Sequence, residues 1–260
     1  MLQMKRLEII TQQLKINKIV NVKDLSKLLN VTEKTIRLDL NVLERAHMLE
    51  RIHGGAVVAK QQPASLPTTS YRKSHENEKN IIAQRALQML HENDVILLDD
   101  GSTTLALAKL LGDFKLTVLT NDVFIINELM YKPNINLYVI GGSLKRDGDS
   151  FVINGEDAVQ YIKKYRVNKL FLGISTIDIE NGLMIFYYGD RSTKRAFMAA
   201  AEQIICMADS SKFNSSAFTH VARIDEIDTI ITDSNISDDD LEKYQSVGVN
   251  IIVANESSAD

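Results

Sequence analysis

The stretch TEKTIRLDL, residues 32–40, decides how the N-terminal part of the chain is interpreted. Ile36 and Leu40, continued by Leu43, recur at i, i+4 and i+7, which is the spacing of one buried helix face. Thr32 can cap the start of this helix, because its hydroxyl can accept a hydrogen bond from a free backbone N–H. The stretch therefore predicts a short amphipathic helix.

The opposite face of this predicted helix is polar. With the apolar residues pointing inward, Lys34, Thr35, Arg37 and Leu38 project outward near the helix N-terminus. A DNA-reading helix keeps its base and phosphate contacts at that end. A solvated helix face has the same appearance, so the neighbouring segments have to decide between the two interpretations.

Two more helices are predicted ahead of residue 32. The first has apolar residues at helical spacing, namely Leu7, Ile10 and Leu14. The second is expected to start after a cap at Asn21 and to bury one face, formed by Val22, Leu25, Leu28 and Leu29. Three helices in this order are the plan of a helix-turn-helix domain.

Residues 49–59, LERIHGGAVVA, predict a β-hairpin. Strand-forming residues lie on both sides of Gly54-Gly55, which is a strong turn signal. A hairpin after the second helix of a helix-turn-helix unit is a wing. Arg51 and His53, on its first arm, are candidates to contact a DNA phosphate or groove.

The distribution of charge agrees with a nucleic-acid-binding head. Residues 1–60 hold 11 Lys and Arg against 6 Asp and Glu, a net charge of +5, whereas the remainder holds 19 against 28, a net charge of −9. A basic segment on an acidic body is typical of a DNA-binding module joined to a domain of another kind.

Composition restricts the other possibilities. The 260 residues suggest about two domains, and no apolar run reaches the roughly 18 residues of a membrane span. No signal-peptide pattern is recognised, so we expect a cytoplasmic protein without a membrane partner. The single cysteine, Cys206, excludes a disulfide framework, and the five histidines are dispersed. We therefore predict no metal and no cofactor.

A change of composition marks the domain boundary. Residues 61–75 contain Pro63 and Pro67 among Ser, Thr and Gln, and no apolar period continues through them. This segment is predicted to be a linker between a DNA-binding domain at residues 1–60 and an α/β domain at residues 76–260.

The second domain alternates apolar strand-like runs with helical segments. The strand-like runs include VILLD, LTVLT, NLYVIGG, KLFLGI, IICMAD, DTIITD and VNIIVA. The segments predicted to be helical include TTLALAKLL, STKRAFMAAAE and SDDDLEKYQ. Continuous apolar strands separated by helices predict a mostly parallel sheet that is covered on both faces. In such sheets, ligands bind beyond the carboxyl ends of the strands.

Polar residues follow several of these strands. Asp99-Asp100-Gly101-Ser102-Thr103-Thr104 comes directly before a helix, where backbone N–H groups can bind a phosphate; capping of the helix by Ser102 or Thr103 is the alternative. Other strand ends carry Thr120-Asn121-Asp122, Gly141-Gly142-Ser143 with Lys145 and Arg146 beyond, and Asp209-Ser210-Ser211-Lys212. Together they suit a polyhydroxylated, phosphorylated ligand, although each alone can be explained as a turn.

The N-terminal motifs carry a specific resemblance. The pattern TIR-x-DL, followed by LE and R-x-HGGA, resembles the winged helix-turn-helix of the DeoR family of bacterial transcriptional regulators. Family members commonly have a second Arg after TIR, where this chain has Leu38. That change gives up a phosphate or guanine contact and allows contact with a thymine methyl group instead.

The second domain resembles the effector domain of the same family through D-x-GSTT, LTN, GG and ADSSKF. The resemblance implies a fold like that of ribose-5-phosphate isomerase and CoA-transferases. It also implies that Gly101, Ser102, Thr103, Thr104 and Lys212 hold a sugar phosphate while Asp99, Asn121 and Gly142 line the site, with Lys145 nearby. A second departure falls at Met184-Ile185 and at Asp190, where the family often has Glu.

These observations predict a repressor of a sugar, amino-sugar or polyol operon that leaves its operator when a phosphorylated sugar binds. A homo-oligomer, dimer or tetramer, is expected because two heads on repeated half-sites multiply affinity. The alternative is a sugar-phosphate isomerase-like enzyme that uses the same carboxylates. We favour binding without catalysis, because a winged helix has no use in an isomerase.

Overall fold

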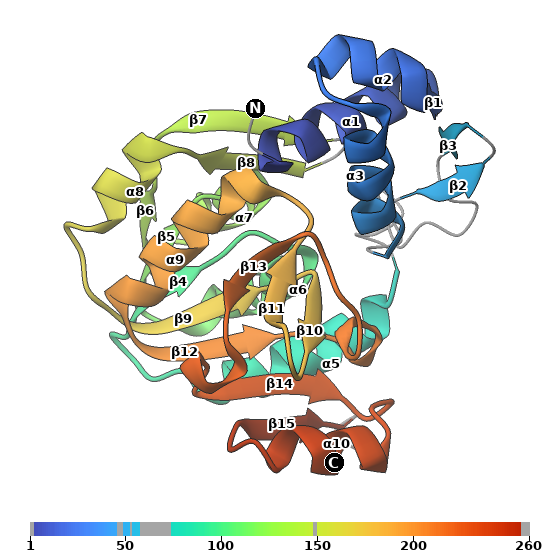
Figure 1. Ribbon diagram of the computed structural model, residues 1–260. Coiled ribbons are helices and arrows are strands. Elements are labelled where there is room, and N and C mark those ends of the chain that lie inside the picture. Colours follow the sequence, from blue (N-terminus) through green and yellow to red (C-terminus); the bar gives the residue numbers. More distant parts are fainter. Residues whose placement is uncertain (1–2, 46–48, 53, 58–73, 148–149, 256–260) are drawn as a thin grey trace. The chain divides into compact units, whose positions relative to one another are not determined.

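The computed structural model describes residues 3–45, 49–52, 54–57, 74–147 and 150–255 (Figure 1). The chain divides into two compact units, Met1–Ser65 and Leu66–Asp260. Most of the predicted linker, residues 61–75, lies outside the described residues.

The N-terminal unit is a winged helix-turn-helix, as predicted. Its elements are α1 (Gln3–Asn17), β1 (Ile19–Asn21), α2 (Val22–Leu29), α3 (Glu33–Arg45), β2 (Glu50–Ile52) and β3 (Gly55–Val57). The wing strands β2 and β3 are antiparallel, and β1, which the sequence pattern did not predict, pairs with the other side of β3. Gly55 permits this pairing, because a Cβ atom there would lie 2.1 Å from the Val20 carbonyl oxygen.

The predicted apolar faces form the core of this unit. Ile36, Leu40 and Leu43 are all buried, as are the three apolar residues predicted for α1. Asn21 caps α2 by accepting a hydrogen bond from the Lys23 N–H. Leu28 was expected on the buried face of α2 and is instead 58% exposed, so that prediction is wrong. Leu25 and Leu29 already cover the inner stripe, which leaves Leu28 on the outer side of the helix.

A buried ion pair joins α1 to α3. Asp39 is 1% exposed and lies among the apolar residues of α3, where the Arg6 guanidinium donates to both of its carboxylate oxygens at 2.7 and 3.1 Å. The same contact raises the pKa of Arg6. Because a buried carboxylate is stable only when it is paired, this contact fixes the packing of α1 on α3.

We predict that Asp39→Ala destabilises the helix-turn-helix unit by about 3 kcal/mol, because it removes the buried partner of the Arg6 guanidinium. Hydrogen exchange of the α1 and α3 amides in the full chain measures this change directly. The control is Glu33→Ala, which removes the exposed Glu33–Arg37 pair and should cost less than about 0.5 kcal/mol. Equal exchange rates in the two variants would contradict the prediction.

The C-terminal unit is built on a seven-stranded sheet in the order β15-β14-β12-β9-β4-β5-β6, in which every pair is parallel. Its strands are β4 (Val95–Leu98), β5 (Leu116–Thr120), β6 (Ile135–Val139), β9 (Val167–Gly173), β12 (Ala201–Met207), β14 (Thr229–Asp233) and β15 (Asn250–Ala254). The predicted parallel sheet is therefore confirmed.

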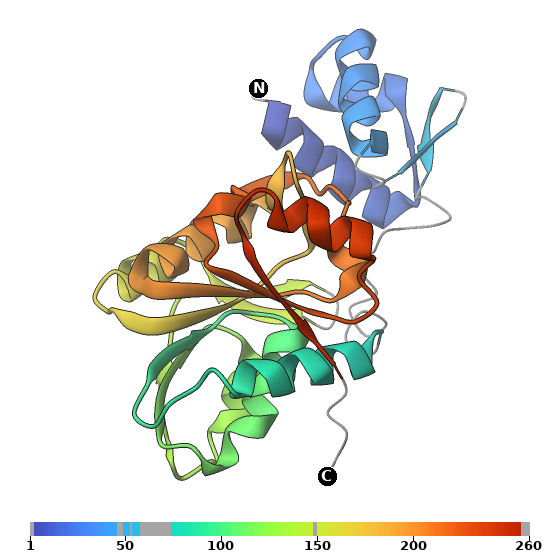
Figure 2. The same cartoon turned by 90° about the horizontal axis from the view of Figure 1, so that it is seen from below.

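Helices cover both faces of this sheet, because successive residues of each strand point to opposite sides. Ile96 and Leu98 pack with α5 (Glu76–Leu87), α6 (Ser102–Leu110) and α7 (Val123–Leu129). Leu97 packs in a second core with α8 (Glu156–Ile162), α9 (Arg191–Ala200) and α10 (Asp238–Gln245). Figure 2 shows α5, in teal, on one side of the sheet and α9 and α10, in orange and red, on the other.

Several elements of this unit were not predicted. A hairpin is formed by β7 (Ser143–Asp147) and β8 (Ser150–Asn154), and a small antiparallel sheet by β10 (Thr176–Asp178), β11 (Gly182–Ile185) and β13 (Thr219–Ala222). The segment STKRAFMAAAE was expected to be helical throughout, but α9 ends at Ala200 and β12 begins at the next residue. Among the described residues, none of the helices combines the length and the apolar character needed to span a bilayer.

Candidate effector site and DNA-reading surface

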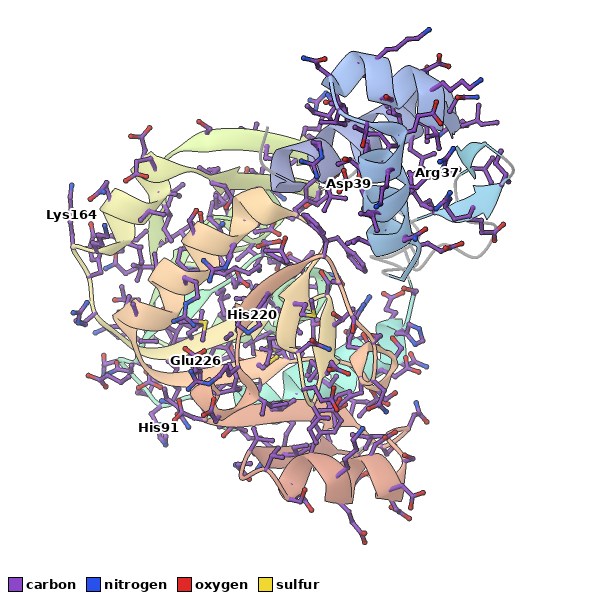
Figure 3. All side chains as sticks on the ribbon, in the orientation of Figure 1. Arg37, Asp39, His91, Lys164, His220 and Glu226 are labelled. Carbon is purple, nitrogen blue, oxygen red and sulfur yellow. The ribbon has the colours of Figure 1, made fainter. Side chains whose placement is uncertain are left out.

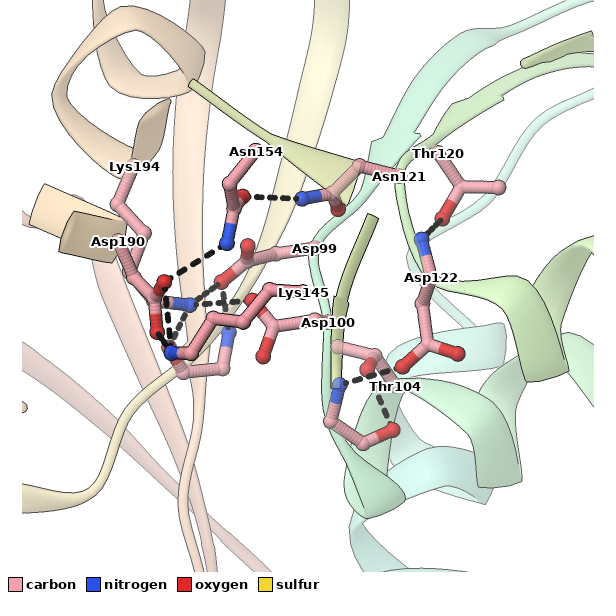
Figure 4. A network of polar contacts seen from close by, with 12 residues as sticks. Asp99, Asp100, Thr104, Thr120, Asn121, Asp122, Lys145, Asn154, Asp190 and Lys194 are labelled. Atoms are coloured by element: carbon pink, nitrogen blue, oxygen red, sulfur yellow. Dashed lines mark hydrogen bonds and ion pairs between the residues drawn. The ribbon is translucent and has the colours of Figure 1, made fainter. Parts of the chain in front are cut away.

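The polar strand ends come together at one edge of the sheet. Leu98, at the end of β4, lies level with Thr120 of β5 and Phe171 of β9. The residues that follow these strands therefore meet beyond their carboxyl ends, as expected for parallel strands. Figure 4 shows the network of polar contacts that they form with side chains from β7, β8 and α9.

Lys194, on α9, is the centre of this network. Its ammonium donates to Asp99 Oδ2, to Asp100 Oδ1 at 3.0 Å and to the Gly173 carbonyl at 3.2 Å. Asp99 Oδ2 also accepts the Gly173 N–H at 3.0 Å. Gly173 is required here, because a Cβ atom would lie 2.4 Å from the Asp100 carbonyl oxygen.

The protonation of this cluster follows from its charge balance. One buried ammonium faces two carboxylates, so it can neutralise only one of them. Burial raises the pKa of Asp99 to about 8, whereas Lys194 holds the pKa of the partly exposed Asp100 below its usual value. The two carboxylates in turn raise the pKa of Lys194. At neutral pH the Asp99 carboxyl is mostly protonated, and the three groups together carry almost no net charge.

A second ion pair ties the β7–β8 hairpin to the start of α9. Lys145 Nζ donates to the two carboxylate oxygens of Asp190 at 3.0 and 2.8 Å and lies 3.7 Å from the ring centroid of Tyr187. Asn154 Nδ2 donates to Asp190 Oδ1 at 2.7 Å, and Asn154 Oδ1 accepts a hydrogen bond from Asn121 Nδ2 at 3.1 Å. Burial raises the pKa of Asp190. The departure from the family at Asp190 thus lies inside the network.

The turn after β4 leads into α6 without a side-chain cap. Gly101 is the N-cap residue and has a φ of +149°; within the described residues, no side chain bonds to the free amides of the first turn. Capping by Ser102 or Thr103, the alternative to a phosphate site, is therefore absent in this part of the chain. The Gly101 N–H itself donates to Asp122 Oδ2 at 3.3 Å, and Asp122 Oδ1 caps α7.

Lys212 lies at a different strand end. It belongs to the short helix η3 (Ser210–Lys212) after β12, and β9 separates β12 from β4 in the sheet. Burial lowers the pKa of Lys212, while the Asp209 charge opposes this shift. Asp209 accepts hydrogen bonds from the N–H and hydroxyl of Ser211, and Asp233 accepts those of Ser210. An anion bound nearby would stabilise the charged form of such a buried lysine.

The predicted effector residues differ in accessibility. Asp99, Asn121 and Thr104 are at most 1% exposed and Thr103 is 8% exposed, so they position other groups. Three others are half-buried, namely Gly101, Ser102 and Lys145. Lys212 is 8% exposed, and Gly142 is exposed. A Cβ atom at Gly142 would lie 2.8 Å from the Asn154 carbonyl oxygen, which explains the glycine. The effector role of these residues remains a prediction.

Lys194 is not among the site residues predicted from the sequence, and no site role is predicted for Asp190. A signal for Lys194 was present, because it precedes Phe197 and Met198 by three and four residues and so lies on the apolar stripe of α9. A lysine at such a position is buried only when it is paired. Across the described residues, no group of three His, Cys, Asp or Glu side chains could hold a metal ion.

The outer face of α3 carries the predicted DNA contacts. Lys34, Arg37 and Leu38 are exposed and Thr35 is half-buried. Arg37 and Asp39 project from different sides of α3 (Figure 3). Among the ion pairs of the described residues, Arg37 takes part in one, an exposed pair with Glu33 at 2.9 Å. His53 lies outside the described residues.

Arg51 fastens the wing to α3. Its guanidinium donates to the Arg37 carbonyl at 3.3 Å, to Asn41 Oδ1 and to the Gly55 carbonyl at 3.3 Å. From the sequence, this side chain is predicted to contact a DNA phosphate or groove. In the structure it bonds within the unit, so it positions the wing relative to the residues on α3.

These two units define a class of protein, a winged helix-turn-helix regulator joined to a separate sensor domain. Residues 6–62 match the DeoR-like helix-turn-helix domain, and residues 74–234 match the DeoR C terminal sensor domain. The chain belongs to the DeoR family of transcriptional regulators.

Relatives match along most of the chain. The uncharacterized HTH-type transcriptional regulator YulB of Bacillus subtilis (strain 168) is 36% identical over 231 residues, which are 86% of this chain and 89% of the relative. The putative aga operon transcriptional repressor of Escherichia coli O157:H7 is 34% identical over 254 residues, 96% and 94% of the two chains. Among solved structures, ribose 5-phosphate isomerase A from Methanocaldococcus jannaschii is 18% identical with a TM-score of 0.40, covering 54% of this chain and 55% of that chain.

The Asp99 proton makes a testable contribution to stability. The folded pKa of about 8 lies above the ordinary value of 3.8, so between these pH values the folded chain holds a proton that the unfolded chain has lost. The free energy of unfolding should therefore fall as pH rises from 5 to 8, by up to about 1.4 kcal/mol per pH unit. Asp99→Asn removes this proton, and urea titrations at several pH values should show a shallower decline.

Asp113→Asn, at an exposed position on the same unit, is the matched control and should keep the wild-type slope. The raised pKa of Asp190 acts in the same direction, so part of the slope should remain in Asp99→Asn. If Asp99→Asn and the wild type have identical slopes, the Asp99 carboxyl is ionised in the folded protein at neutral pH and the proposed charge balance is wrong.

Proposed function

We propose that this protein is a repressor of a carbohydrate-utilisation operon and that a phosphorylated sugar or polyol releases it from its operator. The observation that carries the proposal is that one chain holds a winged helix-turn-helix unit and a sensor domain with a polar network beyond the ends of its strands. The relative from Escherichia coli, named as an aga operon repressor, supports the assignment to carbohydrate genes.

The proposed DNA contacts are those of the outer face of α3, made by Lys34, Thr35, Arg37 and Leu38. Arg37 can reach a guanine or a phosphate, and the exposed Leu38 can contact a thymine methyl group. His53 is proposed to contact DNA from the wing. Arg51 is proposed to orient the wing through its bonds to α3, and to contact a phosphate only if DNA displaces one of them.

We predict that Arg37→Ala weakens operator binding by about 1–3 kcal/mol if Arg37 makes a bidentate base contact. Binding of the full chain to a promoter fragment, followed by fluorescence anisotropy at fixed salt, measures the loss. Lys109→Ala removes one exposed positive charge from the sensor unit and should bind like the wild type. Operator occupancy that survives deletion of residues 1–60 would show that this unit is not the reader.

The proposed effector contacts combine two kinds of group. The free amides at the start of α6, with Ser102, are suited to a phosphate, because a helix N-terminus attracts anions. The partly exposed Asp100, Lys145 and Asp190 can bind sugar hydroxyls as acceptors and donors. Lys212 is proposed to contribute positive charge from the neighbouring strand end.

We predict that Lys212→Ala and Ser102→Ala still bind operator DNA but require more sugar phosphate for release. The loss of a charge-assisted contact of about 1.5–3 kcal/mol should weaken the effector roughly ten- to a hundredfold for Lys212→Ala. The measurement is operator release, titrated with a panel of sugar and polyol phosphates. Lys163→Ala, an exposed lysine on the same unit, is the control. Superimposable release curves for all four proteins would contradict the assigned site.

An isomerase-like enzyme is the second candidate, since Asp99, Asp100 and Lys194 are groups that can transfer protons. Incubation with sugar phosphates and detection of aldose–ketose conversion distinguishes the two. We favour a sensor without catalysis, because Asp99 and Lys194 are buried and hydrogen-bonded to each other. Turnover that depends on Lys194 would overturn this choice.

A further inference from the structure

The edge strand β6 has an unusual surface. Within the described sheet, β6 is the last strand and pairs only with β5. Edge strands of monomeric proteins usually carry charged residues or proline, which prevent pairing with another chain. Residues 134–144, NINLYVIGGSL, contain neither.

Exposed apolar side chains gather along this edge. In the described part of the sensor unit, the large apolar side chains that are at least 36% exposed are Leu110, Met130, Tyr131, Tyr138, Val139, Leu144 and Val247. All except Leu110 and Val247 lie on β6 or on the segments directly before and after it. Tyr138 is supported from within by Tyr165, whose ring centroid is 5.7 Å away, so it is held at the edge.

The hydrogen-bond register shows which backbone groups face outward. The Ile140 N–H donates to Thr120 of β5, and the Asn134 carbonyl accepts from Leu116 of β5. Residues of a strand alternate in the side to which their backbone groups point, so the even-numbered residues face β5. Leu137 and Val139 therefore direct their N–H and C=O groups to the open side.

We propose that β6 pairs with β6 of a second copy of this chain, antiparallel about a two-fold axis at Tyr138, to form one continuous fourteen-strand sheet. In this register Leu137 of one copy lies opposite Val139 of the other and exchanges two backbone hydrogen bonds with it. The symmetry-related pair, Val139 of the first copy and Leu137 of the second, adds two more. Tyr138 faces its own counterpart.

A second copy is the occupant that the strand itself favours. Pairing about a two-fold axis places each patch against itself, so a charged strand would meet its own charge. No charged residue lies on β6 (Ile135–Val139), which removes that repulsion, and the exposed side chains of Tyr138 and Val139 come to lie against the second copy. This interface would form the homo-oligomer that the proposed function requires. The observations that support it concern β6 alone and do not depend on that function.

The mass of the full-length protein in solution, without DNA or effector, tests the interface separately from the proposed function. We expect an even-numbered oligomer of the 29.2 kDa chain by light scattering at micromolar concentration. Val139→Lys places a charge at the interface, and Val139→Pro removes the outward N–H without touching the bonds to β5. Both should halve the mass while the circular dichroism spectrum stays unchanged.

Val247→Lys is the matched control, because Val247 is 42% exposed against 41% for Val139 and lies away from β6. It should retain the wild-type mass. A monomeric wild type, or folded Val139 variants that keep the wild-type mass, would overturn the proposal.

Single cysteines test the register. Two Tyr138→Cys chains should form a disulfide across the axis, since directly opposed residues lie about 4.5–5.5 Å apart at Cα. Two Asn136→Cys chains should not, because the axis separates them by about 13 Å along the strands. The native Cys206 is buried and does not compete. An oligomer that forms no disulfide at position 138, or forms it equally at position 136, overturns this pairing.

Discussion

The sensor domain depends on the ammonium of Lys194. This one cation contacts the ends of β4 and β9 through Asp99, Asp100 and the Gly173 carbonyl, while its own backbone belongs to α9. Burying a lysine is costly, and it is stable here because three oxygen acceptors replace its water shell. In return, a helix on one face of the sheet is fixed relative to the two central strands. Without the ammonium, the Asp100 carboxylate and the buried Asp99 carboxyl would lose their shared hydrogen-bond donor.

The arrangement around this cluster has two layers. The inner layer, with Asp99 and Asn121, is closed to solvent and sets the positions of the loops. The outer layer contains the Lys145–Asp190 pair, which links the β7–β8 hairpin to the start of α9. The short Asp190 side chain reaches Lys145 and Asn154 directly, so it joins both strands of the hairpin to the start of α9.

Local patterns predicted the elements better than they predicted contacts between distant residues. The helical spacing of Ile36, Leu40 and Leu43 was sufficient to place α3, because a helix face repeats within a few residues. Asp39 was not recognised as buried, because its partner Arg6 lies 33 residues away. Lys194 was missed for the same reason, since its two carboxyl acceptors, Asp99 and Asp100, are 95 and 94 residues distant. The hairpin β7–β8 lacked the strict alternation that identifies a strand.

The two sides of α3 differ in what a substitution costs. Residues on the inner side hold the helix-turn-helix together, so changes there reduce stability by several kcal/mol. Residues on the outer side, including Lys34 and Leu38, contact little within their own unit, and surface changes of this kind usually alter stability by less than about 0.5 kcal/mol. Evolution can therefore exchange the residues on the outer side one at a time without an intermediate that fails to fold. An exposed leucine such as Leu38 is the kind of residue that this side of the helix can acquire or lose while the inner side keeps the unit folded.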